Sequence, residues 1–310
     1  MSVRQVREVS GTRRDEPRTV RAPEGADGAA VGDAPAAPDG AAPPARAPGG
    51  GRRPLTVRGL TVRFGGLTVV EDLSLEVEAG EFVALVGPSG CGKSTTLNAI
   101  SGLLRPGGDT VVDGEVVVPD DVRLAYAFQK DALLPWSTAR RNVEVGAELA
   151  GVPKRDRPRI ATDLLDQVGL QGFEGRYPHQ LSGGMRQRVA LARVLAYDPD
   201  LILMDEPFGA LDAFIRMNLQ NQLLDVWSRT RKTMVLVTHD LTEALILGTR
   251  VVVLSPSPGR VHEVVDNSEW PEDRRSEEVR SSTEFLEKYK RLWETMMALG
   301  AAAKTGEEGR

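Results

Sequence analysis

The chain has 310 residues, of which 41% are hydrophobic and 27% are charged, and its formal net charge is −5. The apolar side chains are sufficient for a hydrophobic core. The acidic balance argues against a general affinity for nucleic acid, so we expect no nucleic-acid partner. No apolar run approaches the roughly 18 residues that a membrane-spanning helix needs, and the single cysteine, Cys91, excludes an internal disulfide framework.

Residues 1–54 differ in composition from the rest of the chain, being rich in Ala, Pro, Gly and mixed charges and poor in large apolar residues. Such a segment cannot bury enough surface to offset an ordering cost of about 1–2 kcal/mol per residue, so we expect a disordered tail. Arg13 and Arg14 are not followed by the apolar core of an export signal. We therefore expect the protein to stay in the cytoplasm.

Two segments after the tail alternate apolar and polar residues, as half-buried antiparallel strands do: LTVRGLTVRF at residues 55–64 and LSLEVEAGE at residues 73–81. They predict a small β layer. A third segment, FVALV at residues 82–86, is continuously apolar and predicts a buried strand.

The buried strand opens directly into GPSGCGKST, which matches the P-loop pattern G-x-x-x-x-G-K-S/T. Glycines permit positive φ and remove Cβ atoms, so backbone N–H groups can cradle phosphate oxygens at the start of the following helix. Lys93 is expected to reach the β and γ phosphates, and the Ser94 hydroxyl to bind Mg²⁺. The predicted phosphate-binding set is Gly87, Pro88, Ser89, Gly90, Cys91, Gly92, Lys93, Ser94 and Thr95. Cys91 itself is expected to be inert; the alternative is a thiol activated by the helix N-terminus.

Three further apolar runs end on Gln129, on the pair Asp205 and Glu206, and on His239. If these runs lie parallel to the first, their ends converge beyond the carboxyl edge of the sheet, where open α/β sheets bind ligands. Each residue alone has a plain explanation as a helix cap or a loop residue. Adjacent strand residues point to opposite faces, so we assign Asp205 to Mg²⁺ and Glu206 to the water that attacks the γ phosphate, with Pro207 ending the strand.

Residues 256–310 follow the last predicted core strand, RVVVLS, and contain one amphipathic helix. We expect Ser281 and Glu284 to form its capping box and Gly300 to lie just past its end. Its apolar face should pack on the chain's own core, the alternative being a regulatory or subunit contact. That face comprises Phe285, Leu286, Tyr289, Leu292, Trp293, Met296 and Met297. His179 and His262 lack metal-ligand spacing and are expected in loops.

A fifth motif, LSGGMRQ at residues 181–187, begins an amphipathic helix, and its two glycines make the helix N-terminus an anion site. Together with the P-loop, LILMDEP, GALD at residues 209–212 and THD at residues 238–240, it resembles the nucleotide-binding subunit of an ABC transporter over residues 55–255. The resemblance implies an α/β fold: a RecA-like P-loop NTPase core, an antiparallel β subdomain and a helical ABC-specific subdomain at about residues 130–185.

The signature motif could in principle serve the chain's own nucleotide. The resemblance implies instead that Ser182, Gly183 and Gly184 close over ATP bound to a second cassette, expected to be a copy of this chain, with Asp212 near the seam. It further implies that His239 contacts the γ phosphate and that Gln129 senses the metal and the water. Phe64 would stack on the adenine, the alternative being a buried core residue.

The function implied is ATP hydrolysis that drives a membrane importer from the cytoplasmic face of the membrane. The partners would be integral permease subunits and, indirectly, an extracytoplasmic solute-binding protein. DALLPW at residues 131–136 is similar to importers of the nitrate, sulfonate and taurine group, where this loop borders the groove for a permease helix. Without that resemblance, the loop's simplest fate is burial. The alternative function is that of a soluble ABC ATPase not engaged in transport.

Overall fold

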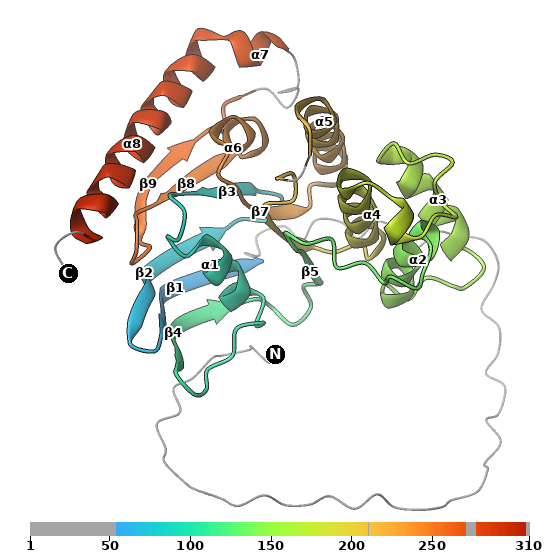
Figure 1. Cartoon of the computed structure of the whole chain (residues 1–310), viewed down its shortest axis with the longest axis horizontal. Helices are drawn as coiled ribbons and strands as arrows, with labels where there is room; N and C mark the ends of the chain where they lie inside the picture. The colour runs from blue at the N-terminus through green and yellow to red at the C-terminus, as the bar shows by residue number, and fades with distance from the viewer. Residues whose placement is uncertain (1–53, 210, 271–276, 308–310) are drawn as a thin grey trace, which may run out of the picture.

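The computed structural model describes residues 54–209, 211–270 and 277–307. Within these ranges the chain forms two sheets and several helices, which is the predicted α/β class (Figure 1). The predicted tail, apart from Pro54, lies outside the described residues.

The smaller sheet is antiparallel and has the strand order β2-β1-β4, formed by β1 (Leu55–Phe64), β2 (Leu67–Val77) and β4 (Thr110–Val117). The first strand was predicted from its alternation, whereas the second, expected at residues 73–81, begins earlier, at Leu67, and ends at Val77. The two strands pair through a tight turn at Gly65 and Gly66, both with positive φ. Residues on the inner face pack against one side of the larger sheet and form a continuous apolar cluster with it.

The larger sheet has the order β5-β6-β7-β3-β8-β9, in which every neighbouring pair is parallel except β8 and β9. Its strands are β3 (Phe82–Val86), β5 (Leu124–Ala127), β6 (Leu201–Asp205), β7 (Thr233–Val237), β8 (Arg250–Leu254) and β9 (Val261–Asp266). All residues of β3, β6 and β7 are buried, as expected for parallel strands covered on both faces. β9 was not predicted. The expectation that His179 and His262 lie in loops was wrong for both residues, because His179 belongs to a 3₁₀ helix at Pro178–Gln180 and His262 belongs to β9.

Helices cover both faces of the larger sheet, and α2, α3 and α4 gather beside β5 (Figure 1). Side-chain caps fix several of their starts: Thr138 accepts a hydrogen bond from Arg141, Ser182 from Met185, and Asp212 from Ile215. The helices are α1 (Lys93–Ile100), α2 (Ala139–Leu149), α3 (Arg157–Gln167), the 3₁₀ helix η1 (Pro178–Gln180), α4 (Gly183–Ala196), α5 (Ala213–Thr230), α6 (Leu241–Leu247), α7 (Glu277–Ser281) and α8 (Thr283–Glu307).

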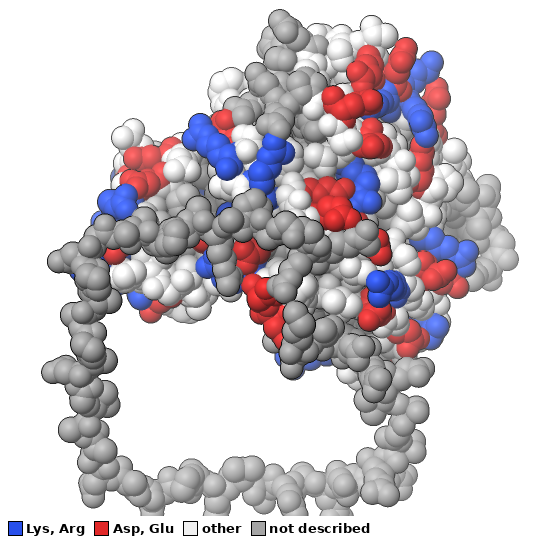
Figure 2. All heavy atoms as spheres, turned by 180° about the vertical axis from the view of Figure 1, so that it is seen from behind, with Lys and Arg blue, Asp and Glu red and all other residues white. Residues whose placement is uncertain are grey.

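Charged side chains of both signs are interspersed on the face of the molecule shown in Figure 2. Where described residues form this face, Figure 2 shows the two signs alternating over short distances, an arrangement in which neighbouring charges partly offset one another.

The predicted C-terminal helix exists, but its ends and its apolar face differ from expectation. The hydroxyl of Ser282, not Ser281, accepts the backbone hydrogen bond of Phe285, and Glu284 instead accepts a hydrogen bond from the indole of Trp270. Gly300 lies inside α8 rather than past its end, because one glycine costs a helix only about 1 kcal/mol.

Four of the seven residues of the predicted apolar face pack on the chain's own core, with Tyr289 and Met296 partly buried against it. Phe285 and Leu292 are buried, whereas Leu286, Trp293 and Met297 remain more than half exposed or nearly so. Phe285 and Leu292 belong to the main apolar cluster, and α8 contacts α6. These contacts hold α8 against the core.

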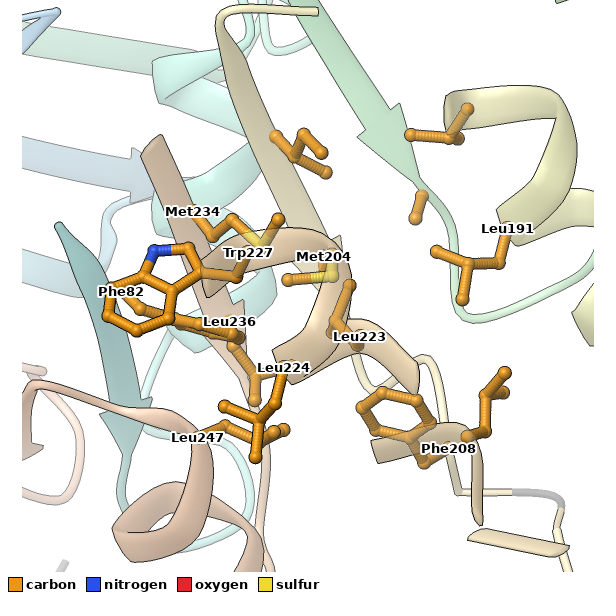
Figure 3. Packing of buried hydrophobic residues seen from close by; sticks show 14 of the residues in the cluster. Phe82, Leu191, Met204, Phe208, Leu223, Leu224, Trp227, Met234, Leu236 and Leu247 are labelled. Atoms are coloured by element: carbon orange, nitrogen blue, oxygen red, sulfur yellow. The ribbon is translucent and has the colours of Figure 1, made fainter. Parts of the chain in front are cut away.

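Trp227 of α5 anchors the core on the helical side of the larger sheet, where it lies among Phe82, Met234 and Leu236 (Figure 3). Its side chain is 2% exposed, and its indole N–H donates to the Gly80 carbonyl at 3.0 Å. The tryptophan therefore combines a large apolar surface with a satisfied polar group.

Replacing Trp227 with Ala should lower the free energy of unfolding by about 3–5 kcal/mol, because it leaves a large cavity and an unpaired carbonyl. Denaturant unfolding of the full chain checks this. The matched control is Trp293→Ala on α8, where the side chain is half exposed and the loss should be about 1 kcal/mol or less. Equal losses for the two variants would contradict the proposed anchoring.

Candidate nucleotide-binding site

The P-loop connects β3 to α1 and has the backbone that the glycine pattern predicts. Gly90 and Gly92 have φ values of +80° and +89°, which L side chains rarely adopt. A Cβ atom at Gly87 would lie 2.9 Å from the Leu254 carbonyl oxygen. The Lys93 ammonium donates to the carbonyls of Gly87 and Pro88 at 2.8 and 3.0 Å, which holds the side chain over the loop.

The P-loop packs against two other segments, β2 and the turn that follows β8. A Cβ atom at Gly92 would lie 2.7 Å from a methyl of Val70, and one at Gly259 would lie 2.0 Å from the Cys91 carbonyl oxygen. The Gly259 N–H donates to the Val69 carbonyl at 2.8 Å. Three separate segments are therefore in direct backbone contact at this point.

Cys91 is fully buried beneath the loop. Burial raises the pKa of its thiol, and this outweighs the opposing influence of the neighbouring Lys93 ammonium. The thiol is therefore protonated at neutral pH, which favours the inert interpretation over the activated thiol.

Ser94 and Asp205 meet at the carboxyl edge of the sheet. The Ser94 hydroxyl donates to Asp205 Oδ1 at 2.9 Å, and the hydroxyl of Tyr126 lies 3.5 Å from Asp205 Oδ2. Burial, with a smaller contribution from Glu206, raises the pKa of Asp205. Tyr126 was not predicted as a site residue. It lies on β5, three residues before Gln129, and no motif in the sequence distinguishes it.

Glu206 contacts one residue that follows β5 and one that follows β7, the two strands on either side of β6. Its Oε2 accepts a hydrogen bond from Gln129 Nε2 at 3.3 Å and lies 3.3 Å from Nδ1 of His239. The argument from strand alternation was wrong in detail, because β6 ends at Asp205 and Glu206 has a left-handed backbone with φ of +45°. That backbone turn, and not alternation, separates the two carboxylates.

The structure thus brings Lys93, Ser94, Gln129, Asp205, Glu206 and His239 to one edge. It does not bring the signature motif there. Ser182 caps α4, and α4 lies with α2 and α3 on the opposite side of β5 from α1 in the view of Figure 1.

The signature motif contacts two other motifs of its own chain instead. Gln187 donates to the Gln129 carbonyl at 3.4 Å, and a Cβ atom at Gly184 would lie 2.8 Å from a methyl of Leu211. Asp212 caps α5 by accepting from the Ile215 N–H at 3.0 Å. Phe64, at the end of β1, is 37% exposed, so the alternative of a buried core residue was wrong.

Comparison with known proteins decides the family. The sequence matches the family model described as ABC transporter over residues 70–209. An uncharacterized ABC transporter ATP-binding protein of Methanocaldococcus jannaschii is 48% identical over 225 residues, which cover 72% of this chain and 82% of that protein. The chain belongs to the ABC transporter family. It is an ATPase of that family, and the predicted P-loop NTPase fold is confirmed.

Further relatives of this ABC ATPase carry more specific names. Taurine import ATP-binding protein TauB of Roseobacter denitrificans is 45% identical over 214 residues, covering 67% of this chain and 80% of that protein. The protein of the same name from Yersinia pestis bv. Antiqua (strain Antiqua) is 43% identical over 236 residues, covering 75% and 92%.

A solved structure supports the same family and shows a pair of cassettes. The dimeric post-hydrolysis state of an ATP-binding cassette bound to ADP and Pi matches with a TM-score of 0.61 and 31% identity, over 70% of this chain and all of that one.

Cys91 in the folded ABC ATPase should react with iodoacetamide much more slowly near neutral pH than the same residue in denaturant. Its raised pKa leaves little thiolate, and the labelling rate should climb only as the pH rises well into the alkaline range. Mass spectrometry of labelled protein checks this, with the denatured chain as the control. Fast labelling of the folded protein at neutral pH would instead support the alternative, in which the helix N-terminus activates the Cys91 thiol.

Proposed function

We propose that this ABC ATPase powers the import of a small solute, a sulfonate, taurine, nitrate or a similar compound, through separate membrane subunits. The observation that carries the proposal is the contact of Glu206 with both Gln129 and His239 beside the P-loop. It forms one half of an ATP-hydrolysing site, in a chain whose relatives at 43–45% identity are named for taurine import.

In the proposed site, the P-loop N–H groups and Lys93 bind the β and γ phosphates. The hydroxyl of Ser94 and the carboxylate of Asp205, together with the Gln129 side chain, are oxygen donors of the kind that Mg²⁺ prefers, and the first two already lie 2.9 Å apart. The ion, when bound, neutralises charge on the β and γ oxygens.

Glu206 orients the attacking water, and His239 contacts the γ phosphate. The 3.3 Å separation between His239 Nδ1 and Glu206 Oε2 supports this pairing, because each side chain then limits the positions open to the other. Phe64, exposed at the end of β1, offers a π face to the adenine.

A second copy of the chain completes the site in this proposal. Ser182 caps α4, and Gly183 and Gly184 are its first two residues. In Figure 1 this helix lies across β5 from α1, which supports a role at the ATP of the second cassette, with Asp212 at the seam. Dimeric cassettes among the matching solved structures support the same arrangement.

The loop at residues 131–136 is the proposed contact with the permease. Leu133 is buried in the local core, but Trp136 is 74% exposed, and Asp131 is held by an ion pair with Arg186 of the signature helix at 2.8 Å. Exposed aromatic residues often anchor protein–protein contacts. Because this loop is joined to the signature helix, a permease bound to Trp136 would be connected to the part of the chain that we propose contacts ATP.

We place the protein at the cytoplasmic face of the membrane, with an extracytoplasmic solute-binding protein as an indirect partner. No helix among the residues that the structure describes is long and apolar enough to span a bilayer, so the proposed pore lies in other chains.

The proposed division of the chain into domains is a tail at residues 1–54, a cassette at 55–255 with its helical part at about 130–185, and an extension at 256–310.

Glu206→Gln should bind ATP but lose about 10²–10³-fold in turnover, because the amide cannot polarise water as a carboxylate does, and it should accumulate as an ATP-bound dimer. Steady-state ATPase assays and size-exclusion chromatography with ATP measure both effects. Lys93→Ala is the comparison, since it should fail at nucleotide binding itself. Near-normal hydrolysis by the glutamine variant would remove Glu206 from its role.

Trp136→Ala should release the full chain from the membrane fraction of its native cells while leaving basal ATPase activity within about twofold, because the indole lies on the surface and outside the catalytic edge. Trp293→Ala, which removes a half-exposed indole from α8, is the control. A wild-type chain found only in soluble extracts, free of integral membrane proteins, would support the soluble ABC ATPase instead.

A further inference from the structure

Arg216 lies in the first turn of α5 and joins two loops that flank the catalytic edge. Its Nη2 donates to the Leu211 carbonyl at 3.0 Å, and its Nη1 donates to Asp240 Oδ2 at 3.2 Å. The Nε atom is buried without a hydrogen-bond partner among the described residues. The guanidinium group is therefore held through its two terminal nitrogens, one on each loop.

Leu211 belongs to the loop that follows Glu206 and connects Arg216 to the signature motif. Its N–H donates to the Phe208 carbonyl at 3.1 Å, which closes the turn. Its side chain packs so closely on the start of α4 that a Cβ atom at Gly184 would lie 2.8 Å from it. Because Leu211 is in direct contact with α4, a displacement of α4 would also displace Leu211, whose carbonyl accepts a hydrogen bond from Arg216.

Asp240 follows His239 and uses each of its carboxylate oxygens differently. Oδ1 accepts from the N–H groups of Thr242 and Glu243 at 2.9 and 3.2 Å, which caps α6, while Oδ2 faces Arg216. The Asp240 N–H in turn donates to the Thr238 hydroxyl at 3.1 Å. The backbone on both sides of His239 is thus fixed, and Arg216 supplies the connection to the other loop.

We propose that Arg216 is a positioning residue that locks the His239 loop to the loop at residues 209–212. Pairing of two cassettes at the signature motif and Asp212 then sets the position of His239 relative to Glu206. A planar guanidinium can bind a carbonyl and a carboxylate at fixed angles, which a glutamine amide with one donor nitrogen and no charge cannot reproduce. The inference rests on the proposed role of His239 and adds to it the residue that transmits pairing.

The first test is Arg216→Gln in the full chain. We expect kcat for Mg-ATP hydrolysis to fall about tenfold, while the affinity for a nonhydrolysable ATP analogue, measured by calorimetry, and the thermal midpoint stay near wild type. Arg229→Gln near the end of the same helix is the matched control, because Arg229 is exposed and far along α5. It should leave kcat unchanged.

The second test is a double-mutant cycle with Asp240→Asn, which keeps an oxygen to cap α6 but removes the charge that faces Arg216. If the two residues act as one connection, the double variant should be no slower than the slower single variant. Additive losses would overturn the proposal. So would a wild-type rate for Arg216→Gln, or a loss of kcat accompanied by equal losses of analogue affinity and thermal stability.

His239→Ala separates this inference from the function on which it depends. If His239→Ala abolishes turnover while Arg216→Gln is normal, only the role of Arg216 fails. If His239→Ala hydrolyses ATP normally, the proposed site itself is wrong, and the proposal for Arg216 falls with it.

Discussion

Parallel pairing of β5, β6, β7, β3 and β8 is the constraint on which the site depends. Register between neighbouring strands aligns their carboxyl ends, so residues separated by more than a hundred positions arrive at one edge. Ser94 and Asp205, 111 residues apart, meet there through a single hydrogen bond. The register of these buried, continuously apolar strands determines where their carboxyl ends lie. A slip in register between two strands would move the motif at the end of one strand away from the motif at the end of the other.

A second constraint acts on one residue. Glu206 has a left-handed backbone, and its N–H is held by the Val237 carbonyl at 2.9 Å. Non-glycine residues in this conformation are strained and persist where the surroundings over-determine them. Here the left-handed backbone turns the carboxylate away from the strand, toward Gln129, which donates a hydrogen bond to it, and toward Nδ1 of His239. The pair of adjacent acids can therefore perform two tasks although only one of them lies on the strand.

Much of this arrangement could be predicted from sequence, because short apolar runs that end on polar residues are a strong signal of buried parallel strands. The P-loop glycines carried a second independent signal. β9 escaped prediction because its apolar residues do not alternate cleanly, with Val264 exposed and Val265 buried. Ser281 and Ser282 are adjacent, and local pattern alone cannot choose between them as the cap. Arg216 escaped because its two partners lie in different loops, 5 and 24 residues away, and only the folded chain shows that both reach one guanidinium group.

The crowded junction of Gly259, Cys91 and Val69 has a mechanical consequence. With no space for even a methyl group between these backbones, the antiparallel sheet and the phosphate loop cannot shift past one another at this point without a steric clash. The boundary between the sheet and α2–α4 is held differently, by long side chains such as Gln187, which donates to the Gln129 carbonyl at 3.4 Å, and Arg193, which donates to the Ala132 carbonyl at 2.9 Å. Long side chains can adjust their rotamers more easily than packed backbones can shift, so displacement of α2–α4 relative to the sheet meets less steric resistance than displacement of the phosphate loop.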